Sequence, residues 1–129
     1  MAGPSTAARR PIVAAILILA FASAASPIAW AGGDPAKGAE VYEKCFACHS
    51  PDTNRIGPRH RGVVGRKAGS LPDFDYSPAL KSAGFIWDEV LLDRWLTGPA
   101  KLVPGNRMGF QLTDPVQRAD VIAYLKTLK

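Results

Sequence analysis

The chain divides into two parts by its hydrophobic pattern. Apolar residues run almost without a break from Pro11 to Ala25. From Asp34 onward they instead recur at three- and four-residue spacing between polar positions. The second pattern is typical of amphipathic helices, whereas the first has no polar face at all. We therefore treat the two parts separately.

The N-terminal part has the order of a secretory signal peptide. Arg9 and Arg10 precede the apolar run, no acidic residue occurs before Asp34, and Ala29-Trp30-Ala31 forms a small-x-small site. The run of about 15 residues falls short of the roughly 20 that span a bilayer. We expect residues 1–31 to be a signal peptide cleaved after Ala31, with Ala24 a weaker site and an uncleaved anchor as the alternative. Residues 32–129 then form one domain.

Four helices are expected in that domain, each opened by an N-cap acceptor and three of them with proline at the next position. They run from Asp34-Pro35 through Cys48, from Ser77-Pro78 to Gly84, from Asp88 to Gly98-Pro99, and from Asp114-Pro115 to the C-terminus. Glycines and prolines interrupt residues 50–76 and 99–112, which we expect to be irregular. No stretch alternates as a strand does. The predicted fold class is a small all-α domain.

The charge and the cysteine content argue against nucleic-acid binding and against a stabilising disulfide. Removal of Arg9 and Arg10 leaves 14 Lys and Arg against 11 Asp and Glu, a net charge of +3 that is too mild and too evenly spread for nucleic-acid binding. The chain has two cysteines, and a disulfide between residues three positions apart would close too small a loop to brace the fold. A large buried cofactor would stabilise so small a core better.

Cys45-Phe46-Ala47-Cys48-His49 fits the C-x-x-C-H pattern of covalent haem attachment. Thiols three residues apart on one turn can each add to a haem vinyl group, and the adjacent histidine can then ligate the iron. A thioredoxin-like pair would need a preceding strand and a βαβ context. A structural zinc site would need four ligands, usually as two pairs. Neither is visible, so haem attachment is the prediction, with chance occurrence as the remaining alternative.

The second iron ligand decides what the haem does. Met108 is the one methionine of the domain and lies after Pro104-Gly105 between polar neighbours. It could instead be core filler, and His60 is a competing ligand. An iron with His and Met on its two faces suits electron transfer, because both axial sites are filled.

From Gly33 to its C-terminus the chain resembles the class I cytochrome c family, and is similar to its short soluble bacterial members. The matching segments are Gly33-Asp34-Pro35-Ala36-Lys37-Gly38, the C-x-x-C-H, Gly57-Pro58, Gly62-Val63-Val64-Gly65-Arg66, Phe74-Asp75-Tyr76-Ser77, Phe85-Ile86-Trp87, Pro104-Gly105-Asn106-Arg107-Met108 and Arg118-Ala119-Asp120-Val121-Ile122-Ala123-Tyr124-Leu125. The resemblance implies about four helices wrapped around one covalently bound haem c.

The resemblance also implies a role for each site residue. His49 and Met108 would be the axial iron ligands, His60 would not, and Pro58 would offer its carbonyl to the other ring nitrogen of His49. The haem propionates would accept hydrogen bonds from Arg66, Tyr76 and Trp87. The first and last helices would pack through Gly38 and Tyr42 against Val121 and Tyr124.

Two departures from the family bear on the iron. Trp95 stands where the family often has a tyrosine whose hydroxyl reaches the ligand sulfur, and its indole can donate but not accept. Leu80 stands where many members have an asparagine. The basic residues Lys44, Arg59, Arg61, Lys101 and Arg107 would flank the haem edge, whereas Asp73, Asp75, Asp88, Glu89 and Asp93 are expected elsewhere.

The functional hypothesis is therefore a monomeric, periplasmic one-electron carrier, not an enzyme, with no small-molecule substrate at the iron. Its partners would be redox proteins such as a quinol-oxidising complex, an oxidase or a dehydrogenase. Two alternatives stay open: the dedicated cytochrome subunit of a periplasmic dehydrogenase, and a ligand-binding haem protein or peroxidase with an open iron site.

Overall fold

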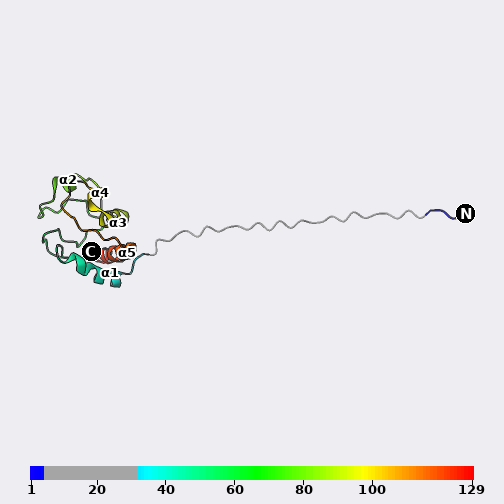
Figure 1. Ribbon diagram of the computed structural model, residues 1–129, viewed down its shortest axis with the longest axis horizontal. Coiled ribbons are helices and arrows are strands. Elements are labelled where there is room, and N and C mark those ends of the chain that lie inside the picture. The colour runs from blue at the N-terminus through cyan, green and yellow to red at the C-terminus, as the bar shows by residue number, and fades with distance from the viewer. Residues whose placement is uncertain (5–31) are drawn as a thin grey trace.

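The computed structural model describes residues 1–4 and 32–129, so the expected signal peptide falls almost wholly outside the described residues. Residues 32–129 form a helical domain (Figure 1). Its elements are α1 (Pro35–Tyr42), the 3₁₀ turn η1 (Glu43–Cys45), α2 (Pro78–Lys81), α3 (Glu89–Thr97), α4 (Pro99–Leu102) and α5 (Pro115–Thr127). In this described part the β pairing is a single isolated bridge between Lys67 and Ile86, which agrees with the all-α expectation.

Side-chain caps begin the helices where the sequence indicates. Asp34 Oδ1 accepts from the Ala36 backbone N–H at 2.8 Å, and Asp88 Oδ1 accepts from the Leu91 N–H at 2.7 Å. Ser77 caps α2 and Asp114 caps α5 in the same way. Each cap satisfies a backbone N–H that has no partner inside the helix. The four predicted helix starts are confirmed.

Three helical features differ from the sequence expectation. The second helix, α2, ends at Lys81 rather than continuing to Gly84. The first helix was expected to continue through Cys48, but its α-helical part ends at Tyr42 and tightens into η1. The segment after Gly98 was expected to be irregular, yet Pro99 opens the additional short helix α4. Gly98 is extended and ends α3 as predicted, and a proline can then occupy the first position of a new turn because its missing N–H is not needed there.

The first and last helices pack closely through Gly38. A Cβ placed on Gly38 would lie 2.0 Å from the backbone oxygen of Asp120, so only glycine lets the backbones of α1 and α5 approach this closely. Beside this contact the rings of Tyr42 and Tyr124 lie 5.1 Å apart, and Val121 is fully buried. The side chain of Asp120 adds a hydrogen bond from the Asp34 N–H at 2.7 Å. Figure 1 shows these two helices on one side of the domain.

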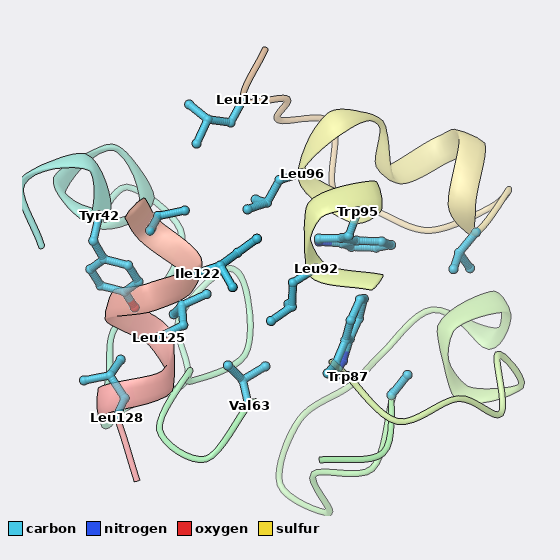
Figure 2. Close-up of a cluster of buried hydrophobic side chains, with 13 residues drawn as sticks. Tyr42, Val63, Trp87, Leu92, Trp95, Leu96, Leu112, Ile122, Leu125 and Leu128 are labelled. Carbon is cyan, nitrogen blue, oxygen red and sulfur yellow. The ribbon is translucent and has the colours of Figure 1, made fainter. Parts of the chain in front are cut away.

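The core joins this helix pair to α3. Figure 2 shows Leu92 and Leu96 of α3 facing Ile122 and Leu125 of α5, with Trp95 on another side of α3. These four aliphatic side chains are at most 7% exposed. Their burial supplies the main stabilisation between α3 and α5, since apolar area removed from water is the largest favourable contribution to folding.

The irregular segment 50–76 is held by backbone hydrogen bonds to distant parts of the chain. The N–H of Gly62 donates to Leu128 O at 2.7 Å, and the N–H of Gly65 donates to Trp87 O at 2.8 Å. Both glycines have positive φ angles, 70° and 91°, which a residue with a side chain rarely adopts. The segment therefore wraps the domain along a fixed course. No helix within the described residues has the length and apolar character needed to cross a membrane.

Candidate functional site

Cys45, Cys48 and His49 lie on one tight turn that follows α1. The backbone N–H groups of Cys48 and His49 both donate to Cys45 O, at 3.0 and 2.7 Å. The two cysteines are free thiols, Cys45 partly buried and Cys48 exposed. Burial, with a contribution from neighbouring Cys48, raises the pKa of the Cys45 thiol to about 11. The turn thus presents two reduced sulfurs and an imidazole side by side.

The His49 ring is fixed by its hydrogen bond to Pro58. Its Nδ1 lies 2.7 Å from Pro58 O, and because a carbonyl can only accept, Nδ1 carries the proton. Burial lowers the pKa of His49, opposed by this hydrogen bond. The neutral ring therefore keeps its lone pair on Nε2, the form in which imidazole binds a metal. Gly57 leaves room for the ring, since a Cβ there would lie 2.2 Å from His49 Cε1.

His60 lies against the same ring, a contact that the sequence analysis did not anticipate. The ring centroids of His49 and His60 are 4.1 Å apart with an interplanar angle of 22°, which is a stacked pair. The Nδ1 atom of His60 is 2.9 Å from the hydroxyl of Tyr42. Burial lowers the pKa of His60 well below its ordinary value, with further contributions from His49 and Arg66. Both imidazoles are therefore neutral.

Met108 is held by the turn that precedes it and by Trp95. Asn106 Oδ1 accepts from the Met108 N–H at 2.7 Å, while its Nδ2 donates to Val103 O at 2.8 Å. An asparagine two residues before the held position is typical of an Asx turn, a sign that the sequence analysis passed over. The indole N–H of Trp95 donates to Met108 Sδ at 3.1 Å. Asn106 thus holds the Met108 backbone, whereas Trp95 orients the thioether, and the methionine packs against the core.

Arg66, Tyr76 and Trp87 form a second polar group. The guanidinium of partly buried Arg66 donates to the carbonyls of Arg61 and Arg59, at 3.1 and 2.9 Å. Among the described residues no carboxylate lies within ion-pair distance of it. Burial lowers its pKa and also raises that of Tyr76, which the charge of Arg66 counteracts. A partly buried cation is a favourable place for an anionic group.

Trp87 links this group to the methionine. Its backbone N–H donates to Arg66 O at 2.9 Å. Its ring packs edge-to-face on Trp95, with centroids 5.3 Å apart (Figure 2). The structure therefore brings the predicted site residues together in two groups: His49 with Pro58, and Met108 with Trp87 and Arg66 through Trp95.

The expected separation of acidic from basic residues is wrong for Asp73 and Asp75. Arg59 pairs with Asp73 at 2.5 Å, and Arg107 and Lys81 both pair with Asp75 at 3.3 Å. Asp73 and Asp75 therefore lie among the cations rather than elsewhere. Glu89 pairs with Lys126, and Asp93 with Arg118 at 2.7 Å. The reason is that the long cation side chains reach across from neighbouring loops, which residue spacing alone does not reveal.

These residues fit a covalently bound haem. Two free thiols stand at the attachment spacing, one neutral imidazole has its Nε2 left as the acceptor, and one oriented thioether supplies a soft donor. Arg66 offers unpaired positive charge for carboxylate groups. Among the described residues, no three His, Cys, Asp or Glu side chains form a group that could hold a metal ion.

Comparison with known proteins agrees with this chemistry. Residues 35–129 match the protein family described as Cytochrome c. The cytochrome c2 of Rhodomicrobium vannielii is 47% identical over 106 residues, covering 79% of this chain and 85% of that protein. The cytochrome c2 of Rhodopila globiformis is 42% identical over 101 residues, covering 75% of this chain and 95% of that protein.

Solved structures give the same result for the fold. The cytochrome cH of Methylobacterium extorquens superposes with a TM-score of 0.71 at 44% sequence identity, covering 74% of this chain and 99% of that one. The ferricytochrome c2 of Rhodopseudomonas palustris superposes with a TM-score of 0.70 at 35% identity, over the same shares of the two chains.

Proposed function

Because the chain belongs to the class I cytochrome c family, we propose that it carries single electrons in the periplasm through one haem c ligated by His49 and Met108. It is an electron-transfer protein with covalent haem c, not an enzyme. The observation that carries the finer proposal is that each of the two donor side chains is held by a neighbour: His49 by the carbonyl of Pro58, and Met108 by the indole N–H of Trp95.

Cys45 and Cys48 attach the cofactor in this proposal, each through a thioether bond to a former vinyl group. The bound haem supplies an iron that changes between the ferric and ferrous states. His49 contributes Nε2, because its Nδ1–H is engaged by Pro58 O. That hydrogen bond fixes the tautomer and increases the basicity of the ligand. Covalent attachment next to the ligand keeps the cofactor from dissociating.

Met108 would supply the second ligand of the iron. A thioether is a soft donor that raises the potential and, with histidine opposite, leaves no open site for a substrate. The Asn106 turn sets the position of the Met108 backbone, and the Trp95 N–H occupies one lone pair of the sulfur while the other remains available. This chain's own residues therefore exclude water and small ligands from the metal.

Arg66, Tyr76 and Trp87 bind the haem propionates. Arg66 is partly buried, its two side-chain hydrogen bonds use backbone carbonyls, and no carboxylate among the described residues pairs with it directly. A propionate would supply the counter-charge and relieve the cost of burying the guanidinium. Tyr76 and Trp87 are both buried and would contribute an O–H and an N–H donor.

Location and partners follow from the proposed export. Cleavage of residues 1–31 after Ala31 would release residues 32–129 as a soluble periplasmic monomer. Its partners would be redox proteins of a respiratory or related chain: a quinol-oxidising complex, an oxidase or a dehydrogenase. The interleaved ion pairs of Arg59 and Arg107 with Asp73 and Asp75 favour a partner that does not depend on a continuous ring of positive charge. N-terminal sequencing of the exported protein tests the cleavage site.

The ligand assignment is tested by the absorption spectrum of the oxidised protein. The wild type should show the weak far-red band of iron bonded to thioether sulfur, and its reduced form should not bind carbon monoxide rapidly. Met108→Ala should lose the band and bind carbon monoxide. Gln111→Ala changes an exposed side chain of the same segment and should retain the wild-type spectrum. A wild type without the band, or Met108→Ala with it, would rule out Met108 as the ligand.

A further inference from the structure

We propose that His60 is a positioning residue for His49, and that its ring, bonded to the hydroxyl of Tyr42, holds the His49 imidazole plane in one orientation. The inference rests on the proposed role of His49 as an iron ligand. It goes beyond that role because it assigns a function to the second histidine of the domain, which the ligand set leaves unused.

Three separate parts of the chain meet in this arrangement. Tyr42 comes from the end of α1, His49 from the attachment turn, and His60 from the irregular segment after Pro58. The His60 ring is 4.1 Å from that of His49, nearly parallel at 22°, while its Nδ1 is 2.9 Å from the Tyr42 hydroxyl. One face of the His60 ring thus stacks on the His49 ring, and its Nδ1 edge bonds the Tyr42 hydroxyl.

Tyr42 is itself rigid, so it can act as the anchor. It is 1% exposed. Its ring packs edge-to-face on Phe46, with centroids 5.1 Å apart, and lies at the same distance from Tyr124 of α5. These contacts connect the His60 ring to the packed interface of α1 and α5 rather than to a loop. A movement of His60 would therefore disturb the hydrogen bond to a fixed partner.

The backbone of His60 is tied to the chain just after His49. The N–H of His60 donates to Ser50 O at 3.0 Å, and the N–H of Arg61 donates to Pro51 O at 2.8 Å. Ser50 and Pro51 are the two residues that follow His49. The stacked pair thus shares a common backbone support, and the distance between the two rings does not depend on long, flexible connections.

The stack supplies a restraint that Pro58 cannot. A single hydrogen bond at Nδ1 fixes one atom of the His49 ring but still allows the ring to tilt about that bond. A parallel ring at van der Waals distance opposes this tilt, because it would press one ring into the other. The outer partners of a metal-bound histidine commonly fix its ring orientation and tune the metal. Here the two partners constrain different directions.

Simple space filling does not account for His60. An aliphatic side chain would fill the same volume without a polar group that burial penalises. The imidazole is retained together with a hydroxyl placed to bond it, and with a ring plane matched to that of His49. Hydrogen bond and parallel stack together indicate that orientation of the ligand is the role.

The readout is the proton NMR spectrum of the ferric protein with its haem attached. The orientation of the imidazole plane sets how unpaired spin spreads over the porphyrin, and therefore how far each haem methyl resonance is shifted. His60→Leu removes the stack and the hydrogen bond, and we expect the spacing among the four methyl shifts to change. His60→Phe and Tyr42→Phe each keep an aromatic ring but remove the same hydrogen bond, and both should give a smaller change.

A double variant distinguishes loss of the His60–Tyr42 hydrogen bond from unrelated effects of the two substitutions. The double variant His60→Phe, Tyr42→Phe should match either single one, because both substitutions remove one shared bond. Tyr124→Phe removes a hydroxyl from the tyrosine beside Tyr42 without touching the stack, and its methyl shifts should equal those of the wild type. Additive effects in the double variant would overturn the proposal, as would unchanged shifts in either His60→Leu or Tyr42→Phe.

Failure of this inference is distinguishable from failure of the proposed function. A wild type that lacks the far-red thioether band would refute the His and Met ligation itself. A wild type that shows the band, with methyl shifts insensitive to His60 and Tyr42, would refute the positioning role alone. If His60→Leu does not fold with haem, the comparison of His60→Phe, Tyr42→Phe and their double variant still decides the question.

Discussion

The indole nitrogen of Trp95 lies 3.1 Å from the sulfur of Met108 and donates its hydrogen to it. Trp95 is buried, and its ring is held edge-to-face against Trp87. Because an indole N–H can only donate, the direction of this hydrogen bond is fixed. Electron density is therefore withdrawn from the thioether that we propose as an iron ligand, which disfavours the ferric state.

Replacing Trp95 by phenylalanine should lower the reduction potential. The variant keeps an aromatic ring but removes the N–H, so the sulfur becomes a better donor to ferric iron. A net hydrogen bond of about 0.5–1.5 kcal/mol corresponds to about 20–60 mV for one electron, and the weak acceptor strength of sulfur favours the lower end. Spectroelectrochemical titration measures the change.

The far-red band of the Trp95→Phe protein provides the internal control, since its retention shows that Met108 still binds the iron. Trp95→Tyr, which offers a hydroxyl donor in place of the indole, should give a potential between those of the wild type and Trp95→Phe. A potential that stays constant or rises in Trp95→Phe, with the band retained, contradicts the role assigned to this hydrogen bond.

A second prediction concerns Gly38, where helix propensity and packing have opposite effects. Alanine would favour the helical conformation of α1 by about 1 kcal/mol. Its Cβ, however, would lie 2.0 Å from Asp120 O and 2.6 Å from Asp120 C, both backbone atoms of α5. The helices would have to separate, and overpacking of this kind costs about 1–3 kcal/mol or more. Thermal unfolding of Gly38→Ala should therefore show a net loss of stability.

Gly109→Ala is the matched control for this substitution. Nothing lies within 4 Å of a Cβ at Gly109, and its φ angle is not in the positive range. The free energy of unfolding should change by no more than about 0.5 kcal/mol. If Gly38→Ala were as stable as Gly109→Ala, the close packing of α1 on α5 would not be a requirement of the fold.

The sequence predicted the helices more reliably than the loops between them. Asp34, Ser77, Asp88 and Asp114 cap helices in the structure, because a cap and its proline act within a few residues of each other. Helix α4 was missed because one turn of four residues leaves no periodicity to detect. The same locality explains why the 3₁₀ turn after Tyr42 was expected to remain α-helical.

The candidate site, too, could be predicted only where residues close together in the sequence define it. The C-x-x-C-H spacing is local, so the sequence indicated the attachment turn at once. The contact of His60 with His49, and the pairing of Asp73 with Arg59, join residues that no common helix or strand connects. Their positions depend on the course of an irregular segment that backbone bonds to Leu128 and Trp87 determine. No pattern within that segment encodes those distant partners.

The third prediction concerns how the contribution of Asp75 to the stability of the fold depends on pH. Hydrogen bonds from Lys81 and then Arg107 hold the pKa of Asp75 below its ordinary value of 3.8. A carboxyl whose pKa is lower in the folded state stabilises the fold above its unfolded pKa, and this stabilisation is lost as the pH falls through the folded value. Asp75→Asn should therefore be less stable than the wild type near neutral pH, by a small amount because the pair is exposed.

The pH profile of thermal unfolding distinguishes the loss of the Asp75 charge from other consequences of the substitution. The difference between Asp75→Asn and the wild type should shrink as the pH falls below 3.8, and added salt should reduce it at neutral pH. Glu43→Gln removes an exposed carboxylate that makes no ion pair among the described residues, and serves as the control. A difference that persists unchanged at low pH would assign the effect to something other than the charge of Asp75.

The last prediction concerns Asp120, whose buried carboxylate accepts the backbone N–H of Asp34 at 2.7 Å and so ties the start of α1 to α5. Asp120→Ala removes the acceptor of that N–H, and because Asp34 is exposed and water can replace the acceptor, the loss should be that of an ordinary hydrogen bond, about 0.5–1.5 kcal/mol. For a domain of this size each kcal/mol lowers the melting temperature by about 4–8 °C. Asp120→Asn keeps an amide oxygen of the same reach and should lose much less stability.

Hydrogen exchange at the Asp34 amide should become faster in the alanine variant than in the asparagine variant. Equal stability and equal exchange in the two would mean that the carboxylate does not hold the N-terminal helix in place.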